Sequence, residues 1–225
     1  ESGYVGYEMW VRALETRVGS IVGASGCFYA IRKSLQDTLF PEALSRDFAC
    51  ALIAWEHGFR AVSVNEAVCF VPRTRSLRAE YGRKVRTMAR GLDTLWYKRN
   101  LMNPARYGLW AWMLISHKLV RWVAVFTLPL GVAGLVILAF SSAPAGVALA
   151  GIMVGAGCGL VGLRWPEGRR VPAPLATAGF LLLAAAASLA AWVKALRRER
   201  NPIWEPTKRP GRPSEAPDPS SSVGS

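Results

Sequence analysis

Asp47 is the acidic residue whose position in the sequence best suits acid–base chemistry. It follows Ser45, a common helix-capping residue type, and the apolar residues after it recur at the spacing of one helix face. A carboxylate in the first turn of a helix stabilises the helix dipole by roughly 0.3–1 kcal/mol, which is a sufficient structural role. The same position also suits a general base at the mouth of a cleft. Sequence spacing alone leaves both roles open and favours the structural one.

A run of small residues precedes Asp47 in the chain. Gly23, Ala24, Ser25 and Gly26 form a segment in which the backbone can approach a bound ligand closely, because bulky side chains are missing. Packing is the more common explanation for a single turn of this kind. The segment is therefore a candidate binding site only in combination with Asp47.

Arg83 and Arg86 are the candidate phosphate-binding residues. They lie in a basic stretch, residues 73–106, with ten Lys and Arg residues against Glu80 and Asp93. On a helix the two arginines share one face, and the opposite face is apolar: Val85, Met88, Leu92, Leu95 and Trp96. Such a helix is typical of a membrane surface, with its apolar side in the lipid boundary. Guanidinium groups also suit phosphate oxygens, and composition supports the two roles equally.

The elements that must position these residues divide the chain into a polar part and an apolar part. The chain has 225 residues, is 52% hydrophobic and carries a formal net charge of +13. Residues 122–163 contain no charged residue or histidine, and a second such run covers 171–193. As helix the first run would be roughly 63 Å long, about twice a hydrocarbon core. These runs exclude a soluble globule and predict three membrane spans at about 121–140, 145–163 and 175–196.

The remaining segments complete the predicted organisation. Residues 1–72 are expected to form part of an α/β domain, with helices at 7–18 and after Ser45 and with strands at 27–31 and 60–64. Residues 107–118 are expected to form an interfacial helix that leads into the first span, and three aromatic residues in and just after it are expected to mark the membrane boundary: Trp110, Trp112 and Trp122. The tail, residues 201–225, is Pro- and Ser-rich and is expected to be disordered after about 209.

Cysteine usage and the start of the sequence add two expectations. The four cysteines show no paired or metal-ligand spacing, so reduced thiols facing the cytosol are expected. The sequence begins without Met or a signal peptide, and we expect it to be a fragment that lacks an N-terminal part. No metal ligand can be named from these residues, and no nucleic-acid recognition motif is present.

Several short motifs follow one another along the chain. They are Tyr7-Glu8 and Glu15; Gly19-Ser20-Ile21-Val22-Gly23-Ala24-Ser25-Gly26-Cys27-Phe28-Tyr29-Ala30-Ile31-Arg32; Ser45-Arg46-Asp47-Phe48; Gly58-Phe59-Arg60 with Asn65-Glu66-Ala67; Arg83-Lys84-Val85-Arg86-Thr87 with Gly91-Leu92; Ser116-His117-Lys118-Leu119-Val120-Arg121-Trp122; and Trp204-Glu205-Pro206-Thr207-Lys208-Arg209. In this order, over residues 4–209, they resemble the acceptor-side half of membrane-embedded, processive family 2 glycosyltransferases. That family includes synthases of cellulose, hyaluronan and poly-N-acetylglucosamine.

The resemblance implies a fold and an activity. The fold would be the C-terminal part of an α/β, GT-A-type glycosyltransferase domain (1–72), then basic amphipathic interfacial helices (73–120) and an α-helical transmembrane region (121–200). The activity would be inverting transfer of a sugar from a nucleotide-sugar donor to a growing glycan at the membrane, as in polysaccharide biosynthesis. Without the nucleotide-binding half, this chain would be inactive alone.

The resemblance also assigns roles to individual residues. Asp47 would be the general base, Gly23, Ala24, Ser25 and Gly26 would line the acceptor site, and Arg83 and Arg86 would lie near the nucleotide diphosphate. Arg46 stands where the family has an acidic residue, and Arg83 and Thr87 replace a Gln and a Trp, whereas Asp47 is retained. A divalent metal, Mg or Mn, would be held by ligands upstream of this chain.

Location and partners follow from the same comparison. The protein would be a multi-pass cell-membrane protein with a cytosolic catalytic part, and its partners would be a nucleotide-sugar donor, a glycan acceptor and the lipid bilayer. The alternative is a non-enzymatic membrane protein whose basic stretch binds anionic lipid or a partner, which requires neither Asp47 nor the Gly23–Gly26 turn. Three spans would place the C-terminus outside, although arginines and a lysine follow the third span, so the side of the tail stays open.

Overall fold

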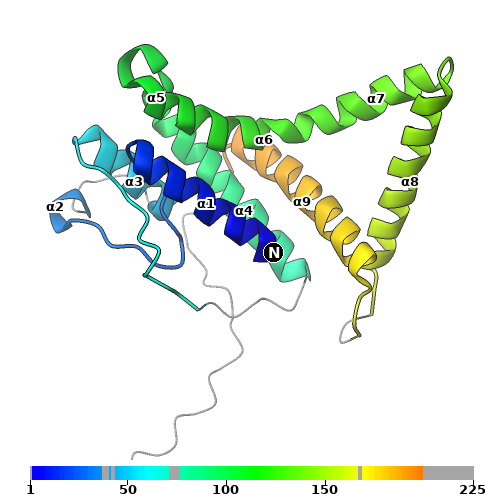
Figure 1. Cartoon of the computed structure of the whole chain (residues 1–225), viewed down its shortest axis with the longest axis horizontal. Helices are drawn as coiled ribbons and strands as arrows, with labels where there is room; N and C mark the ends of the chain where they lie inside the picture. Colours follow the sequence, from blue (N-terminus) through cyan, green and yellow to red (C-terminus); the bar gives the residue numbers. More distant parts are fainter. Residues whose placement is uncertain (1, 37–40, 42–43, 71–76, 167–168, 200–225) are drawn as a thin grey trace, which may run out of the picture.

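A computed structural model describes residues 2–36, 41, 44–70, 77–166 and 169–199, and every regular element in these ranges is helical (Figure 1). The elements in chain order are α1 (Ser2–Val18), α2 (Lys33–Gln36), α3 (Arg46–Glu56), α4 (Leu77–Tyr97), a 3₁₀ turn (Arg99–Met102), α5 (Pro104–Leu114), a π-helical turn (Ile115–Val120), α6 (Arg121–Val123), a 3₁₀ turn (Ala124–Phe126), α7 (Thr127–Ala139), α8 (Ala143–Leu163) and α9 (Ala173–Leu196). The motif at 204–209 and the predicted disorder of the tail lie outside the described residues.

The helix α3, which carries Asp47, forms as its sequence predicts. Ser45 is the N-cap residue with extended backbone angles, and Gly58 adopts a φ of 74° just after the helix, where residues other than glycine are strained. Phe48 and Leu52 are buried on the inner face. The N-cap position of Ser45, the apolar spacing and a glycine stop therefore agree on the bounds of this helix, although the Ser45 side chain makes no capping hydrogen bond.

The predicted strands are not observed. Residues 27–31 and 60–64 are described without strand structure. Ala61 instead accepts a hydrogen bond from the Ile21 N–H (2.9 Å) and donates its own N–H to the Ser20 hydroxyl (2.9 Å). These local contacts, partly to a side chain, take the place of the continuous backbone ladder that a strand requires. The α/β part of the predicted fold class thus finds no support in the described residues.

Three helices lie where membrane spans were predicted, and each is long and apolar enough to cross a membrane: Pro104–Ala139, Ala143–Leu163 and Ala173–Leu196. The first runs from α5 to α7 and includes residues 107–118, so the predicted interfacial helix leads into the first span without a break, and its depth in the membrane stays a prediction. Gly108, with φ 56° and ψ −137°, kinks its first part. The uncharged portion, residues 122–139, is about 27 Å long, close to the thickness of a hydrocarbon core.

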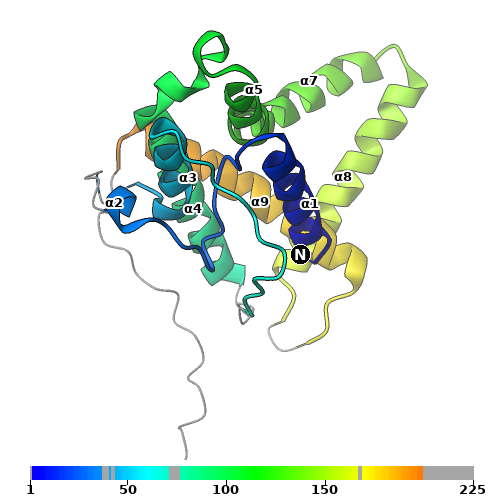
Figure 2. The same ribbon diagram turned by 60° about the vertical axis from the view of Figure 1, so that its left-hand side comes forward.

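The basic helix α4 packs against α9 (Figures 1 and 2). The Ser188 hydroxyl on α9 lies 3.3 Å from the Met88 sulfur, and the Lys84 ammonium lies 4.7 Å from the centre of the Phe180 ring. Val85, Leu92 and Leu95 on α4 are buried by protein, whereas Trp96 is 69% exposed. The expectation that this apolar face contacts lipid is therefore wrong, because neighbouring helices cover most of it.

The largest core joins α3 to the start of the apolar region. Trp122 packs edge-on against Phe48 with ring centres 6.0 Å apart, and Trp110 stacks on Trp55 at 4.9 Å. Trp110 and Trp122 are consequently buried, at 3% and 8% exposure, and they are core residues instead of membrane-boundary residues. Of the three predicted boundary aromatics, Trp112 alone is exposed, at 59%.

Candidate active site around Asp47

Asp47 lies at the N-terminus of α3 with its carboxylate held in place. The Ser45 hydroxyl donates to Asp47 Oδ1 over 2.6 Å and so leaves its usual capping role. The Ser45 N–H in turn donates to the Thr94 hydroxyl on α4 over 2.9 Å, and Thr94 is fully buried. The carboxylate therefore has one oxygen engaged by a neighbour that is itself anchored to a second helix.

The Gly23–Gly26 segment passes directly beside this carboxylate. The Ala24 N–H donates to the Asp47 carbonyl over 3.3 Å. A Cβ atom at Gly26 would lie 2.8 Å from Asp47 Oδ2, closer than side chains approach one another. The structure thus brings together the acidic residue and the small-residue turn, which are separated by about twenty residues in the sequence.

The turn is held from the other side by Glu15 of α1. Glu15 is 3% exposed; its Oε2 accepts the Val22 N–H over 3.2 Å, and its Oε1 lies 2.5 Å from His117 Nδ1. Arg60 adds hydrogen bonds to the carbonyls of Thr16 and Gly19 at the end of α1. A buried carboxylate with two partners fixes the backbone just before Gly23, so the turn has a defined position next to Asp47.

Tyr29 and Cys50 form a second pair near Asp47 that the sequence did not point out. Burial raises the pKa of the Tyr29 hydroxyl, and its hydrogen bond to the Cys50 thiol and the nearby Asp47 charge raise this pKa further. Burial also raises the pKa of the Cys50 thiol, against the opposing effect of the hydrogen bond to Tyr29. Both groups are neutral at neutral pH, so they can donate hydrogen bonds beside the carboxylate but do not compete with it as bases. Their separation in sequence carries no signal that would have found them.

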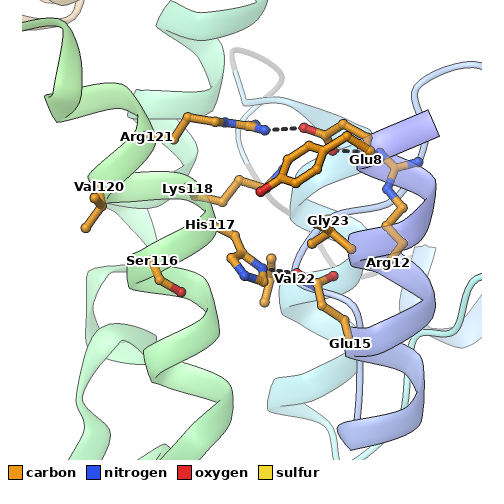
Figure 3. Close-up of a pocket in the computed structure, with 12 residues that line it drawn as sticks. Glu8, Arg12, Glu15, Val22, Gly23, Ser116, His117, Lys118, Val120 and Arg121 are labelled. Atoms are coloured by element: carbon orange, nitrogen blue, oxygen red, sulfur yellow. Dashed lines mark hydrogen bonds and ion pairs between the residues drawn. The ribbon is translucent and has the colours of Figure 1, made fainter. Parts of the chain in front are cut away.

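A pocket of about 190 Å³ adjoins the turn (Figure 3). One wall is α1 and the other is the 116–121 segment, and Gly23 lies between them. Arg121 pairs with Glu8, and His117 pairs with Glu15, as the dashed lines in Figure 3 mark. The Lys118 side chain reaches toward Gly23, where an added Cβ would lie 3.1 Å from Lys118 Nζ, and its ammonium sits 5.4 Å from the centre of the Phe48 ring. Gly23 therefore separates the pocket from the α3 terminus.

Arg83 and Arg86 are not brought to Asp47. Thr94 marks the contact of α4 with the start of α3, and Arg86 precedes it by about 12 Å along the helix, Arg83 by about 16 Å. Arg83 donates to both Glu80 oxygens, at 2.9 and 2.6 Å. Burial of Glu80 opposes its ionisation, but the hydrogen bonds and charges of Arg83 and Lys84 outweigh this and lower the Glu80 pKa. The Arg83 guanidinium group is thus already bound by Glu80. Arg86, one turn farther along α4, is half-buried.

The side chains that could act as metal ligands are dispersed over the described part of the chain. Within the described ranges, no three His, Cys, Asp or Glu side chains gather closely enough to hold a metal ion. The resemblance places the ligands of its divalent metal upstream of this chain, and none of the described residues is assigned to that metal.

Several of the short sequence motifs, although far apart along the chain, lie close together around the start of α3. Glu8 and Glu15 of α1 contact the 116–122 motif. Gly23 lies beside Phe48, and Gly26 lies beside Asp47. Gly91 of α4 lies against the Trp122 ring, and a Cβ added at Gly91 would be 2.8 Å from that ring. Compared with protein-family models, with curated proteins and with solved structures, the chain gives no match. The geometry of this cluster is consequently the observation on which a function can be argued.

Proposed function

We propose that this chain is the acceptor-side part of a membrane-embedded, inverting glycosyltransferase of the family 2 type, with Asp47 as its general base. The observation that carries the proposal is the contact between the Asp47 carboxylate and Gly26, across a turn whose backbone is fixed by Glu15. A structural first-turn aspartate needs neither a glycine at its tip nor a second hydrogen-bonding layer behind that glycine. A base that must be reached by a bulky sugar needs both.

The geometry gives the two carboxylate oxygens different tasks. Oδ1 accepts the Ser45 hydroxyl, which fixes the plane of the group, and Oδ2 lies against Gly26, where a larger residue would displace it. An acceptor hydroxyl would give its proton to Oδ2 while its oxygen bonds to the anomeric carbon of the donor. The bond from that carbon to the diphosphate breaks on the opposite face, and its electron pair leaves with the diphosphate, so the configuration inverts.

The supporting residues act on binding and orientation. Tyr29 supplies a neutral hydroxyl near Asp47 that suits the many hydroxyls of a sugar. Arg86 is the better candidate for a diphosphate contact, because Arg83 is already bound bidentately by Glu80. The donor site itself, with any metal, would belong to a part of the enzyme outside this chain.

Membrane placement accords with this assignment. Three apolar helices make the protein membrane-associated, and we place Asp47 on the cytosolic side, where nucleotide sugars are made, in a multi-pass arrangement. The alternative of a lipid-binding membrane protein without activity draws on the basic charge of α4. Its apolar face is covered by α9, which weakens the case for a lipid-surface helix.

Replacement of Asp47 by Asn tests the proposal. The amide is nearly isosteric with the carboxylate but does not accept the proton, so transfer in washed membranes is expected to fall by on the order of a hundred- to ten-thousand-fold in the full-length enzyme. Glu199→Gln, which removes an exposed carboxylate after α9, is the matched control and should retain wild-type transfer. Equal protein amounts and equal detergent elution profiles would show that folding is intact. Wild-type transfer by Asp47→Asn would return Asp47 to a helix-dipole role.

A further inference from the structure

With His117 counted as neutral, the side chains that line the pocket between α1 and the 116–121 segment carry a net charge of one positive unit. Its walls contain three side-chain cations, Arg12, Lys118 and Arg121, and two carboxylates, Glu8 and Glu15. Glu8 pairs with Arg121 and lies 4.0 Å from Arg12, while Glu15 pairs with His117 and the Val22 N–H. The ion pairs of both carboxylates are thus made with residues other than Lys118, although both also act on its charge at longer range.

Lys118 is the group that carries this excess charge. Among the described residues its ammonium forms no ion pair, and its contact is with the Phe48 ring, 5.4 Å from the ring centre. The side chain is partly covered by protein and reaches along the pocket wall toward Gly23 (Figure 3). A largely covered cation that has no ion pair of its own is unfavourable, even with Glu8 and Glu15 in the same pocket, so the pocket is complementary to a group with a single negative charge.

The position of the pocket along the apolar helix identifies where that group would come from. The polar residues 116–121 interrupt the apolar helix Pro104–Ala139 and are followed by an uncharged stretch of about 27 Å. They therefore mark the level of lipid headgroups. Val120 (55%) and Val123 (40%) expose apolar surface just beside the pocket, and Tyr7 and Trp10 form an exposed aromatic pair at its other rim. Aromatic residues of this kind favour the membrane interface.

We propose that this pocket binds the phosphodiester headgroup of a membrane lipid, with Lys118 as its counter-charge. A phosphodiester carries one negative charge, which matches the pocket, and lysine is a common point-charge partner of phosphate. The acyl chains would lie along the exposed valines, which a soluble sugar acid would not use. The site would hold a lipid next to the acceptor turn, and the inference does not depend on sugar transfer by Asp47.

The test measures binding, so that it is independent of activity. The full chain, purified in detergent, would be titrated with dihexanoylphosphatidylglycerol and with dihexanoylglycerol, which has the same chains and no phosphate. Wild type should bind the phospholipid and not the diacylglycerol. Lys118→Gln should weaken phospholipid binding roughly ten- to a hundred-fold, as expected for a lost charge-assisted contact. Lys118→Arg should retain it, and Lys33→Gln on the exposed helix α2 should have no effect.

Five results would overturn the proposal. Unchanged phospholipid binding by Lys118→Gln would remove the counter-charge role, and so would an equal loss in Lys33→Gln. Equal binding of the diacylglycerol would show an apolar site. Displacement of the lipid by glucuronate or by inorganic phosphate at the same concentration would show a sugar-acid site or a simple anion site. An inactive enzyme that still shows the expected binding pattern would leave this proposal standing and count against the proposed function alone.

Discussion

At the scale of single residues, the position of the Asp47 carboxylate depends on the absence of a side chain at Gly26. Its Oδ2 atom lies 2.8 Å from the place where a Cβ of residue 26 would stand, which is too close for the two atoms to coexist without a shift. The atom that must yield to a larger residue is the end of a side chain, so the backbone can stay where it is. Glycine at this position therefore affects the direction of the carboxylate more than the stability of the fold.

Gly26→Ala is accordingly expected to impair sugar transfer without unfolding the protein. The added methyl group turns the Asp47 carboxylate away from the acceptor turn, and a displacement of this size should lower the transfer rate at least ten-fold, while the unfolding temperature in detergent stays near that of wild type. Gly19→Ala is the matched control, because a Cβ there meets nothing within 4 Å. Equal activity of the two variants would show that Asp47 and Gly26 are neighbours without a shared function.

The sequence indicates which residues could take part in such a site, but not all of its contacts. Asp47 and the glycine turn were recognisable because residue type and a helix start limit their roles. The contact of Lys118 with Gly23 and the hydrogen bond between Tyr29 and Cys50 join segments far apart in the chain. They depend on packing that no local pattern records, and so they emerge only from the structure.

At the scale of elements, α3 is fixed at both ends to the helices that lead toward the membrane. Its start is held by Thr94 of α4 and by the Phe48–Trp122 contact. Its end is held by the Trp55–Trp110 stack and by an ion pair between Glu56 and Lys98. The Trp192 indole of α9 also donates to the Trp122 carbonyl over 2.9 Å. The position of Asp47 is thus coupled to the apolar helices through one aromatic core.

Gly91→Ala tests this coupling within α4. A Cβ at Gly91 would lie 2.8 and 2.9 Å from two ring atoms of the buried Trp122, which has little freedom to move. We expect overpacking to destabilise the protein by about 1–3 kcal/mol, measured by thermal unfolding in detergent. Gly82→Ala lies in the same helix with nothing within 4 Å, and should be neutral or stabilising by up to about 1 kcal/mol. If Gly91→Ala were as stable as Gly82→Ala, Trp122 would not be the rigid link between α3 and α9.

Helices were predictable at this scale and their surroundings were not. The 3.6-residue spacing and the Gly58 stop predicted α3, and the absence of charged residues predicted α7 to α9. These helices were predictable because such signals lie within a short stretch of sequence. The strand predictions at 27–31 and 60–64 were wrong because a strand forms only beside another strand, and local sequence does not specify that partner. Trp110 and Trp122 were placed at a membrane boundary because an aromatic residue next to an apolar run has the same local pattern whether lipid or protein covers it.

At the scale of the whole molecule, the apolar helices are packed by small residues. Gly162 on α8 lies so close to α9 that its Cβ would be 2.2 Å from the Leu175 carbonyl oxygen, and Gly159 would meet Leu182 at 2.4 Å. Close approach of backbones at small residues is typical of helix pairs in membranes. The two helices α8 and α9 therefore form a hairpin, against which α4 lies from the other side.

The orientation of this hairpin decides whether Asp47 can meet a cytosolic nucleotide sugar. Arg164, Arg169 and Arg170 lie between α8 and α9, and an excess of positive charge marks the cytosolic side of a membrane protein. The turn between α7 and α8, at Ser141 and Ser142, should then face outward. If α7 crosses the membrane once, we expect the segment before it, including α3, to lie on the cytosolic side.

Cysteine labelling measures this orientation directly. In full-length protein with Cys27, Cys50, Cys69 and Cys158 replaced by Ala, Ser142→Cys should react with a membrane-impermeant maleimide in intact cells. Pro166→Cys, at an exposed position between α8 and α9, should react only after lysis, which serves as the control for reactivity. The opposite pattern would place the arginine-containing connection outside and Asp47 with it, on the side that lacks nucleotide sugars. The base assignment would then fail for want of a substrate, whatever the local geometry around Gly26.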